Sequence, residues 1–209
     1  MKRKKPLLDQ PTPELVEKYV LQFQNSERYY VSDQAIIKLF SHFPENSHLE
    51  DILLKLSVIN DLYSTNIYAT FKMAKHIQRL KIDPELRKRS TAIVNKIAAF
   101  PITGKTINFY SFATKYCNWH DQNGYPIYDY FVERIIVAYR KRDQFAAFRK
   151  VDLMDYARYK NVLEQFRLFY DLQQFTFKRL DKFLWLYGKE KFPKKGSTKH
   201  SSGRGKPHR

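Results

Sequence analysis

The chain has 209 residues and a formal net charge of +17, and 43% of its residues are hydrophobic. This apolar content is enough for one domain with a buried core, which excludes a chain that is disordered overall. The sequence has no run of about 18 apolar residues and no apolar secretion signal at its start, so we expect neither a membrane span nor export. A single cysteine, Cys117, excludes an internal disulfide and fits a reducing compartment. We therefore expect an intracellular, cytoplasmic protein, associated with the nucleoid if the source is bacterial.

Apolar residues recur at helical spacing along most of the chain, whereas alternating strand patterns are absent. The predicted helix starts before residue 98 are Thr12, Ser32, Ser47, Ile67 and Asp83. A polar, turn-prone run from Asn60 to Asn66 interrupts this series. Further helices are predicted over Met154–Phe175 and Phe177–Tyr187, with Gly188 as the stop. The sequence thus predicts an all-α fold, a compact multi-helix domain of eight to ten helices.

The positive charge lies mainly at the two ends of the chain. Residues 1–5 hold four basic side chains and residues 191–209 hold seven, which leaves an excess of six on the rest. The composition predicts a basic N-terminal arm over residues 1–11, a single helical domain over 12–190, and a disordered basic tail over 191–209. Lys and Arg bind a chain of phosphates through counterion release, so nucleic acid is the expected partner. A solubilising role for the ends and an anionic membrane surface are the alternatives.

The stretch from Ala98 to Ala138 contains the candidate chemistry. It is predicted to hold a helix end, a Pro/Gly turn, an aromatic-rich helix, a second turn and the start of another helix. Free backbone N–H groups at the start of a helix favour an anion, and Lys105 adds a positive charge beside Thr103, Gly104 and Thr106. An ordinary helix–helix turn is the alternative.

Asp129 stands at the predicted start of the helix that carries Val132 and Ile136. An acid at this position commonly caps the helix, and a functional acid there would serve as a general base or stabilise a cationic transition state. His120 is predicted to cap or hydrogen-bond at the end of the preceding helix. The other histidines have no zinc-site spacing, so no metal or cofactor is expected.

Three segments resemble the helix-hairpin-helix superfamily of DNA glycosylases, in order and spacing, over roughly Leu53 to Ala138. They are LSVINDLYSTNIYATFKMAKHI, FPITGKTINFYSFATKYC and YPIYDYFVERI. The resemblance, to divergent and poorly described relatives, implies a helix-hairpin-helix-like centre over residues 98–138. It makes Asp129 the candidate catalytic acid and Thr103, Gly104, Lys105 and Thr106 the hairpin that contacts nucleic acid. It also implies that Tyr63, Ser64, Thr65 and Asn66 probe the minor groove and fill the gap left by an extruded base.

The sequence departs from the family pattern at two places. Only Gly104 stands where the family has Gly-x-Gly, and the position expected for a nucleophilic lysine falls near Ser111. Lys105 lies 24 residues before Asp129 and Lys115 lies 14 before it, so a Schiff-base lyase is not expected. The predicted function is a DNA-binding protein of this type, with duplex DNA as partner and monofunctional N-glycosidic hydrolysis as the hypothesis. A non-catalytic DNA or RNA binder and a helical protein-interaction module are the alternatives.

Overall fold

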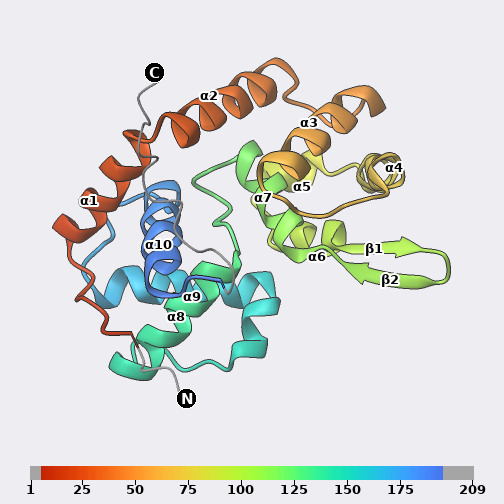
Figure 1. Cartoon of the computed structure of the whole chain (residues 1–209). Coiled ribbons are helices and arrows are strands. Elements are labelled where there is room, and N and C mark those ends of the chain that lie inside the picture. Colours follow the sequence, from red (N-terminus) through yellow and green to blue (C-terminus); the bar gives the residue numbers. More distant parts are fainter. Residues whose placement is uncertain (1–5, 195–209) are drawn as a thin grey trace, which may run out of the picture.

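The structure is a computed structural model that describes residues 6–194 (Figure 1). Residues 1–5 of the predicted arm (1–11) and residues 195–209 of the predicted tail (191–209) therefore lie outside the described residues. Within that range ten α-helices, one short 3-10 helix (η1) and one two-stranded sheet are present, which confirms the all-α prediction. In chain order the elements are α1 Pro13–Gln24, α2 Glu27–His42, α3 Leu49–Leu62, α4 Thr70–Leu80, α5 Asp83–Arg87, α6 Ala92–Ala98, β1 Ala99–Ile102, β2 Lys105–Asn108, α7 Tyr110–His120, α8 Tyr130–Asp143, η1 Lys150–Met154, α9 Tyr156–Phe169 and α10 Phe177–Lys191.

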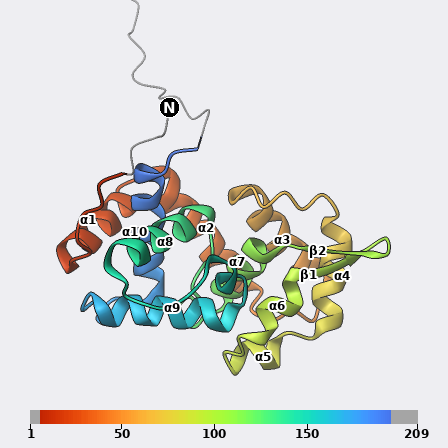
Figure 2. The ribbon, with the colours of Figure 1, turned by 90° about the horizontal axis from the view of Figure 1, so that it is seen from below.

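The helices form two groups (Figures 1 and 2). The C-terminal lobe consists of α1, α8, α9 and α10, and the hairpin lobe consists of α3 to α6 with strands β1 and β2. Helix α2 runs from the first lobe to the second, and α7 lies between them. The core is rich in buried tyrosine and phenylalanine, and it also contains Cys117. None of the described helices is long and apolar enough to cross a membrane.

Several helix boundaries in the structure differ from the predicted ones. Helix α1 begins as predicted, since Thr12 Oγ1 accepts from Leu15 N at 3.2 Å. Helix α2 begins at Glu27, so Ser32 lies inside it and Asp33 faces the interior. The helix predicted from Asp83 is two helices, α5 and α6, and the one predicted over Met154–Phe175 is η1 followed by α9.

The predicted Pro/Gly turn between helices is a β-hairpin. Strands β1 and β2 pair in antiparallel register with Ile102 opposite Lys105, so the turn has two residues, Thr103 and Gly104. Their φ angles are +48° and +75°, the left-handed pair that a tight type I′ hairpin requires. The expectation of a helix start just after Lys105 was therefore wrong, because α7 begins only at Tyr110.

Gly188 does not end the last helix, which continues to Lys191. A Cβ at Gly188 would lie 2.7 Å from the carbonyl oxygen of Phe131. The glycine thus permits close packing of α10 against α8.

The second half of the predicted N-terminal arm is docked on the C-terminal lobe. The Asp9 N–H donates to the Tyr187 hydroxyl at 2.6 Å, and Arg142 donates to the Leu8 carbonyl at 2.6 Å. The described part of this arm is therefore fixed to α8 and α10.

Candidate functional site

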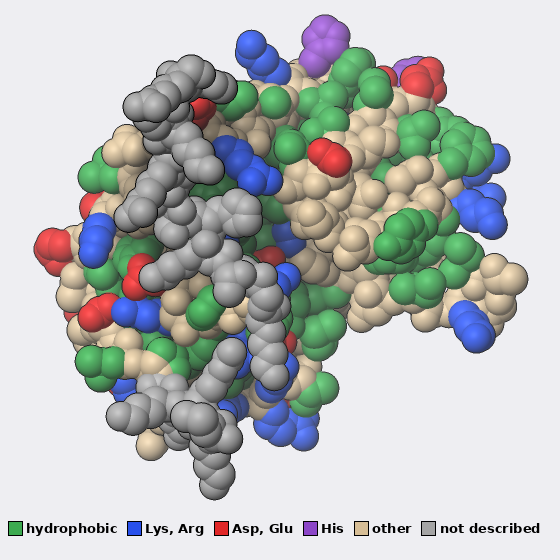
Figure 3. All heavy atoms as spheres, in the orientation of Figure 1, with side chains coloured by type: hydrophobic (Ala, Val, Ile, Leu, Met, Phe, Trp, Pro, Cys, Tyr) green, Lys and Arg blue, Asp and Glu red, His purple; other side chains and the backbone are tan. Residues whose placement is uncertain are grey.

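The surface is hollowed between the two lobes, with basic and acidic side chains inside the hollow (Figure 3). Side chains from α2, the end of α3, α7, the start of α8 and α10 meet where these elements pack together. Most of their side chains are buried or nearly so. We call this set the cleft cluster; its members are Asp33, Tyr63, Lys115, Trp119, Asp129, Lys178, Asp181 and Lys182.

Asp129 is the N-cap of α8, as the sequence predicts. Its Oδ1 accepts from the Phe131 N–H at 2.8 Å, which satisfies one of the free donors at the helix start. Its Oδ2 faces the Lys115 Nζ at 3.8 Å, and the Asp129 side chain is 21% exposed. The carboxylate thus caps the helix with one oxygen and presents the other to a lysine and the cleft.

Lys115 is almost fully enclosed, with a side chain that is 4% exposed. Its Nζ donates to Ser111 Oγ at 2.6 Å, and the carbonyl oxygens of Ser111 and Tyr128 lie farther away, at 3.4 and 3.5 Å. The Tyr63 ring lies beneath it, with its centroid 5.5 Å from Nζ. The ammonium therefore has one short and two long hydrogen bonds, a looser pairing than three short ones would give a buried charge.

Burial shifts the pKa values of Lys115 and Asp181 in this cluster. Removal from water lowers the pKa of Lys115 below its ordinary value, against the opposing negative charges of Asp129 and then Asp181. Burial likewise raises the pKa of Asp181 to about 7, although the Ile127 N–H, Lys178 and Lys115 lower it. Lysines and carboxyls with displaced pKa values that share one cleft are typical of functional sites.

Aromatic rings and a buried ion-pair network form the rest of the cleft cluster. Asp33 lies 3.4 Å from Lys178 Nζ and 3.1 Å from Lys182 Nζ. The Lys178 ammonium also sits 3.9 Å from the Trp119 ring centroid, a close cation–π contact. Burial is the main reason that the pKa of Tyr63 is raised, so this hydroxyl is a neutral hydrogen-bonding group.

The loop after α3 adjoins the cleft cluster through Tyr63. Ser64 and Asn66 adopt left-handed φ angles of +49° and +59°. Asn60 fixes the loop: its Oδ1 accepts from Thr65 Oγ1 at 2.8 Å and from the Ile67 N–H at 2.9 Å. The structure thus brings Tyr63 into contact with the site and places Ser64, Thr65 and Asn66 on a preorganised loop beside it.

The hairpin residues lie apart from Asp129. Thr103, Gly104, Lys105 and Thr106 are exposed, and the hairpin points away from the C-terminal lobe in both views (Figures 1 and 2). The helix N-terminus that was expected to bind an anion here is not present, because residues 105–108 form strand β2. These residues are available to a long ligand, but they do not touch the cleft cluster.

Sequence reasoning missed Lys115 as a partner of Asp129. Lys115 lies one helical turn after Ser111, the position where the resemblance expected a lysine, and residues i and i+4 share a face of a helix. It also missed the contributions of Asp33, Lys178 and Asp181. The one available signal was a lysine inside an aromatic-rich helix, Tyr110–His120.

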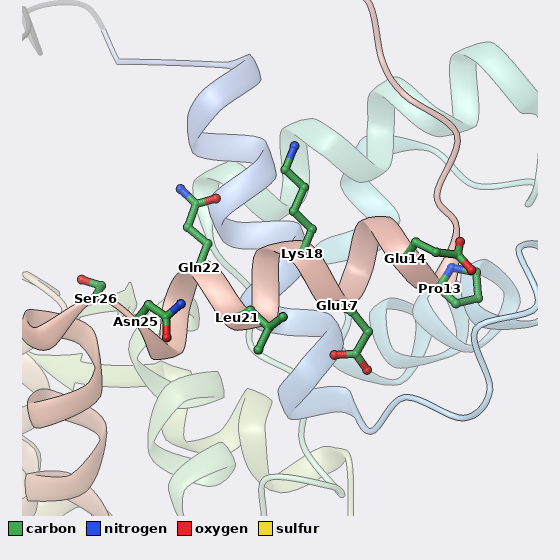
Figure 4. A pocket seen from close by; sticks show the side chains of 8 residues that line it. All are labelled: Pro13, Glu14, Glu17, Lys18, Leu21, Gln22, Asn25 and Ser26. Carbon is green, nitrogen blue, oxygen red and sulfur yellow. The ribbon is translucent and has the colours of Figure 1, made fainter.

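Two other hollows are less suited to chemistry. The groove along α1 (Figure 4) is lined by residues of that helix and its ends, including Glu14, Glu17 and Lys18. A pocket of about 350 Å³ beside Phe40 and His120 lies between α2 and α7. His120 is hydrogen-bonded there, since its Nε2 lies 3.2 Å from Asn46 Nδ2, as predicted for a residue at a helix end.

Burial lowers the pKa of His120 to about 3, so its ring is neutral and structural. Among the described residues no group of three His, Cys, Asp or Glu side chains is arranged to hold a metal ion. The cleft cluster is therefore the strongest candidate site.

Comparison with known proteins identifies relatives of the chain. Residues 15–124 match the family HI_0787_N, described as an N-terminal domain. A protein of Haemophilus influenzae Rd named "Uncharacterized protein" is 41% identical over 151 residues, which cover 72% of each chain. No solved structure matches. The matched range, residues 15–124, includes Tyr63 and Lys115 but ends before Asp129. The candidate site therefore contains residues from inside and from outside the matched domain. The chain belongs to the HI_0787_N family.

Proposed function

We propose that the chain is a DNA-binding enzyme of the base-excision type, in which the Lys115 amine attacks the sugar of a damaged nucleotide beside Asp129. The observation that carries this proposal is the 3.8 Å separation between a buried lysine nitrogen and a carboxylate fixed at a helix start. The monofunctional hydrolysis expected from the sequence needs only the acid. The proximity of Lys115 favours the amine mechanism instead.

The chemistry follows from the protonation of the two groups. A neutral amine adds to the C1′ carbonyl carbon of an open-chain abasic sugar, a C–N bond forms, and the carbonyl oxygen leaves as water to give an imine. Burial favours the neutral amine of Lys115, because the charged form loses its hydration. The protonated imine is a cation, which the negative charge of Asp129 stabilises.

Exposed aromatic and basic side chains of the hairpin lobe support a nucleic-acid substrate. Tyr68 is 94% exposed on the loop that Asn60 fixes, and Phe71 is 51% exposed at the start of α4. Lys75 Nζ lies 4.8 Å from the Phe71 ring centroid. Aromatic faces stack on bases while lysines pair with phosphates, a combination typical of polynucleotide-binding surfaces.

The test is covalent trapping on a duplex oligonucleotide with one abasic site. Borohydride reduces an imine to a stable amine, so the wild-type protein should form an adduct that resists denaturation. The K115M variant should form none. K160M is the matched control, because Lys160 also has a pKa lowered by burial but lies on α9. Equal adduct formation by K115M and wild type would contradict the proposal.

A non-catalytic role gives a different result. In that case the wild-type protein binds duplex DNA with an affinity that falls steeply with salt, yet traps no adduct. Mobility-shift titrations at two salt concentrations, run beside the trapping assay, separate the two functions.

A further inference from the structure

The segment before α8 is held by buried side chains at almost every backbone polar group. The Ile127 N–H donates to Asp181 Oδ2 at 3.0 Å, and the Ile127 carbonyl accepts from the Tyr159 hydroxyl. The Pro126 carbonyl accepts from the Tyr156 hydroxyl at 2.9 Å. Such a loop has little freedom, so Asp129 at its end is fixed relative to Lys115.

Asp181 differs from the other residues that hold this segment because it can carry a charge. It lies on α10, is 5% exposed, and its Oδ1 is buried without a hydrogen-bond partner. A neutral side chain would satisfy the Ile127 N–H equally well. A buried carboxyl with a free oxygen is costly unless the charge serves a purpose.

Charged and titratable groups surround Asp181 and Lys115 from every packed element. They are Asp33 of α2, Tyr63 at the end of α3, Tyr128 and Asp129 before α8, Tyr156 and Tyr159 of α9, Lys178 and Lys182 of α10, and Lys194 after α10. After Asp129, Asp181 is the strongest negative influence on Lys115.

We propose that Asp181 is a positioning residue of the Lys115–Asp129 site, which holds Asp129 in place through Ile127 and whose charge controls whether the Lys115 nitrogen keeps its proton. This inference deepens the proposed function and rests on it for its catalytic meaning. Ionised Asp181 stabilises the ammonium of Lys115, and protonated Asp181 does not. The amine is therefore more available when Asp181 carries a proton.

The test compares wild type with D181N, whose amide oxygen still accepts from the Ile127 N–H. The first readout is the labelling rate of Lys115 by an amine-specific acylating reagent, followed by peptide mass spectrometry. Near pH 8, where Asp181 is ionised in the wild type, D181N should label at least about threefold faster, because lost negative charge lowers the pKa of the lysine. Near pH 5.5, where Asp181 is protonated, the two rates should agree.

If Asp181 has only a structural role, the labelling rate of Lys115 in D181N should differ from that in wild type by the same factor at pH 5.5 and pH 8. That result would overturn the inference. D155N removes the same charge from the N-cap of α9 and should match wild type throughout. The second readout is the pH profile of abasic-site trapping, which should shift to lower pH in D181N. If the wild-type protein traps no abasic-site DNA, the proposed function is contradicted. The role of Asp181 is still tested, because the labelling rate of Lys115 does not depend on DNA.

If D181N does not fold, the wild-type protein supplies the measurement. The NMR signal of the Lys115 side chain should report two titrations, its own and that of Asp181. A Lys115 signal that does not respond as Asp181 titrates would overturn the inference.

Discussion

Two buried lysines of this protein, Lys55 and Lys115, have opposite surroundings. Lys55 Nζ donates to the carbonyls of Phe43 and Glu45 at 3.0 and 2.7 Å and to Asn46 Oδ1 at 2.9 Å. Its three N–H donors are thus matched by three close oxygens, and no described carboxylate lies within ion-pair distance. Lys115 has one short hydrogen bond and a carboxylate at 3.8 Å.

The difference shows that burial alone does not mark a functional lysine. Burial lowers the pKa of Lys55 to about 8, and the pKa of Lys115 is lowered for the same reason. Lys55 binds the end of α2, where free carbonyls need donors, so its ammonium is structural. Lys115 has one short and two long hydrogen bonds and faces an acid, so its ammonium is less tightly paired than that of Lys55.

Replacing Lys115 should have the largest effect on activity. We expect K115M to lose at least about 1000-fold in the rate of abasic-site processing, because the nucleophile is absent. Its free energy of unfolding should fall by only about 1–3 kcal/mol, since Asp129 loses its lysine but stays 21% exposed and bonded to the Phe131 N–H. Single-turnover kinetics and urea unfolding measure the two quantities. If K115M is inactive because it is unfolded, Lys115 would be structural like Lys55, and the contrast between the two lysines would have no support.

Replacing Lys55 should have the largest effect on stability. K55M leaves the carbonyls of Phe43 and Glu45 without donors, and we expect a loss of about 3–5 kcal/mol in the free energy of unfolding. Thermal unfolding monitored by circular dichroism tests this. A K55M protein as stable as K115M would show that the two sites do not differ as described.

Changing Asp129 should separate its capping role from its electrostatic role. Asn is also a good N-cap, so D129N should fold normally while the processing rate falls by about 10- to 100-fold. D129A should in addition lose about 1 kcal/mol of stability through the missing cap. Equal rates for D129N and wild type in single-turnover assays would remove Asp129 from the mechanism.

The pH dependence of stability should report Asp181. Its pKa is raised to about 7 in the folded protein from an ordinary value of 3.8, so the folded state binds the proton more tightly than the unfolded state. This group therefore favours folding most at acidic pH, and its contribution falls as the pH rises from about 4 to about 7. Urea midpoints measured across this range should show a decline that D181N lacks. The same slope in both proteins would assign the decline to other groups.

The smallest effect is expected at the hairpin. Gly104 has a φ of +75° and open space around the position of a Cβ, so G104A should cost about 1 kcal/mol from backbone strain alone. Because the hairpin does not touch the cleft cluster, trapping at saturating DNA should be unchanged. A large loss of trapping in G104A would place the hairpin in the chemistry after all.

The sequence carried enough information for the helical fold and for the capping role of Asp129. Helical periodicity and cap residues such as Thr12 and Asp129 are local signals, and the structure confirms both caps. The hairpin was missed because a Thr-Gly pair between a short apolar segment and a polar one fits a helix–helix turn equally well. The cleft cluster was missed because Asp33 and Lys178 are far apart in sequence, and only the tertiary fold brings them within ion-pair distance.

The most direct test of the central claim is to locate the trapped bond. After borohydride reduction of the wild-type protein with abasic-site DNA, proteolysis and tandem mass spectrometry should place the sugar adduct on Lys115. An adduct on an exposed lysine such as Lys105, or on no lysine at all, would contradict a nucleophile at the Lys115–Asp129 site.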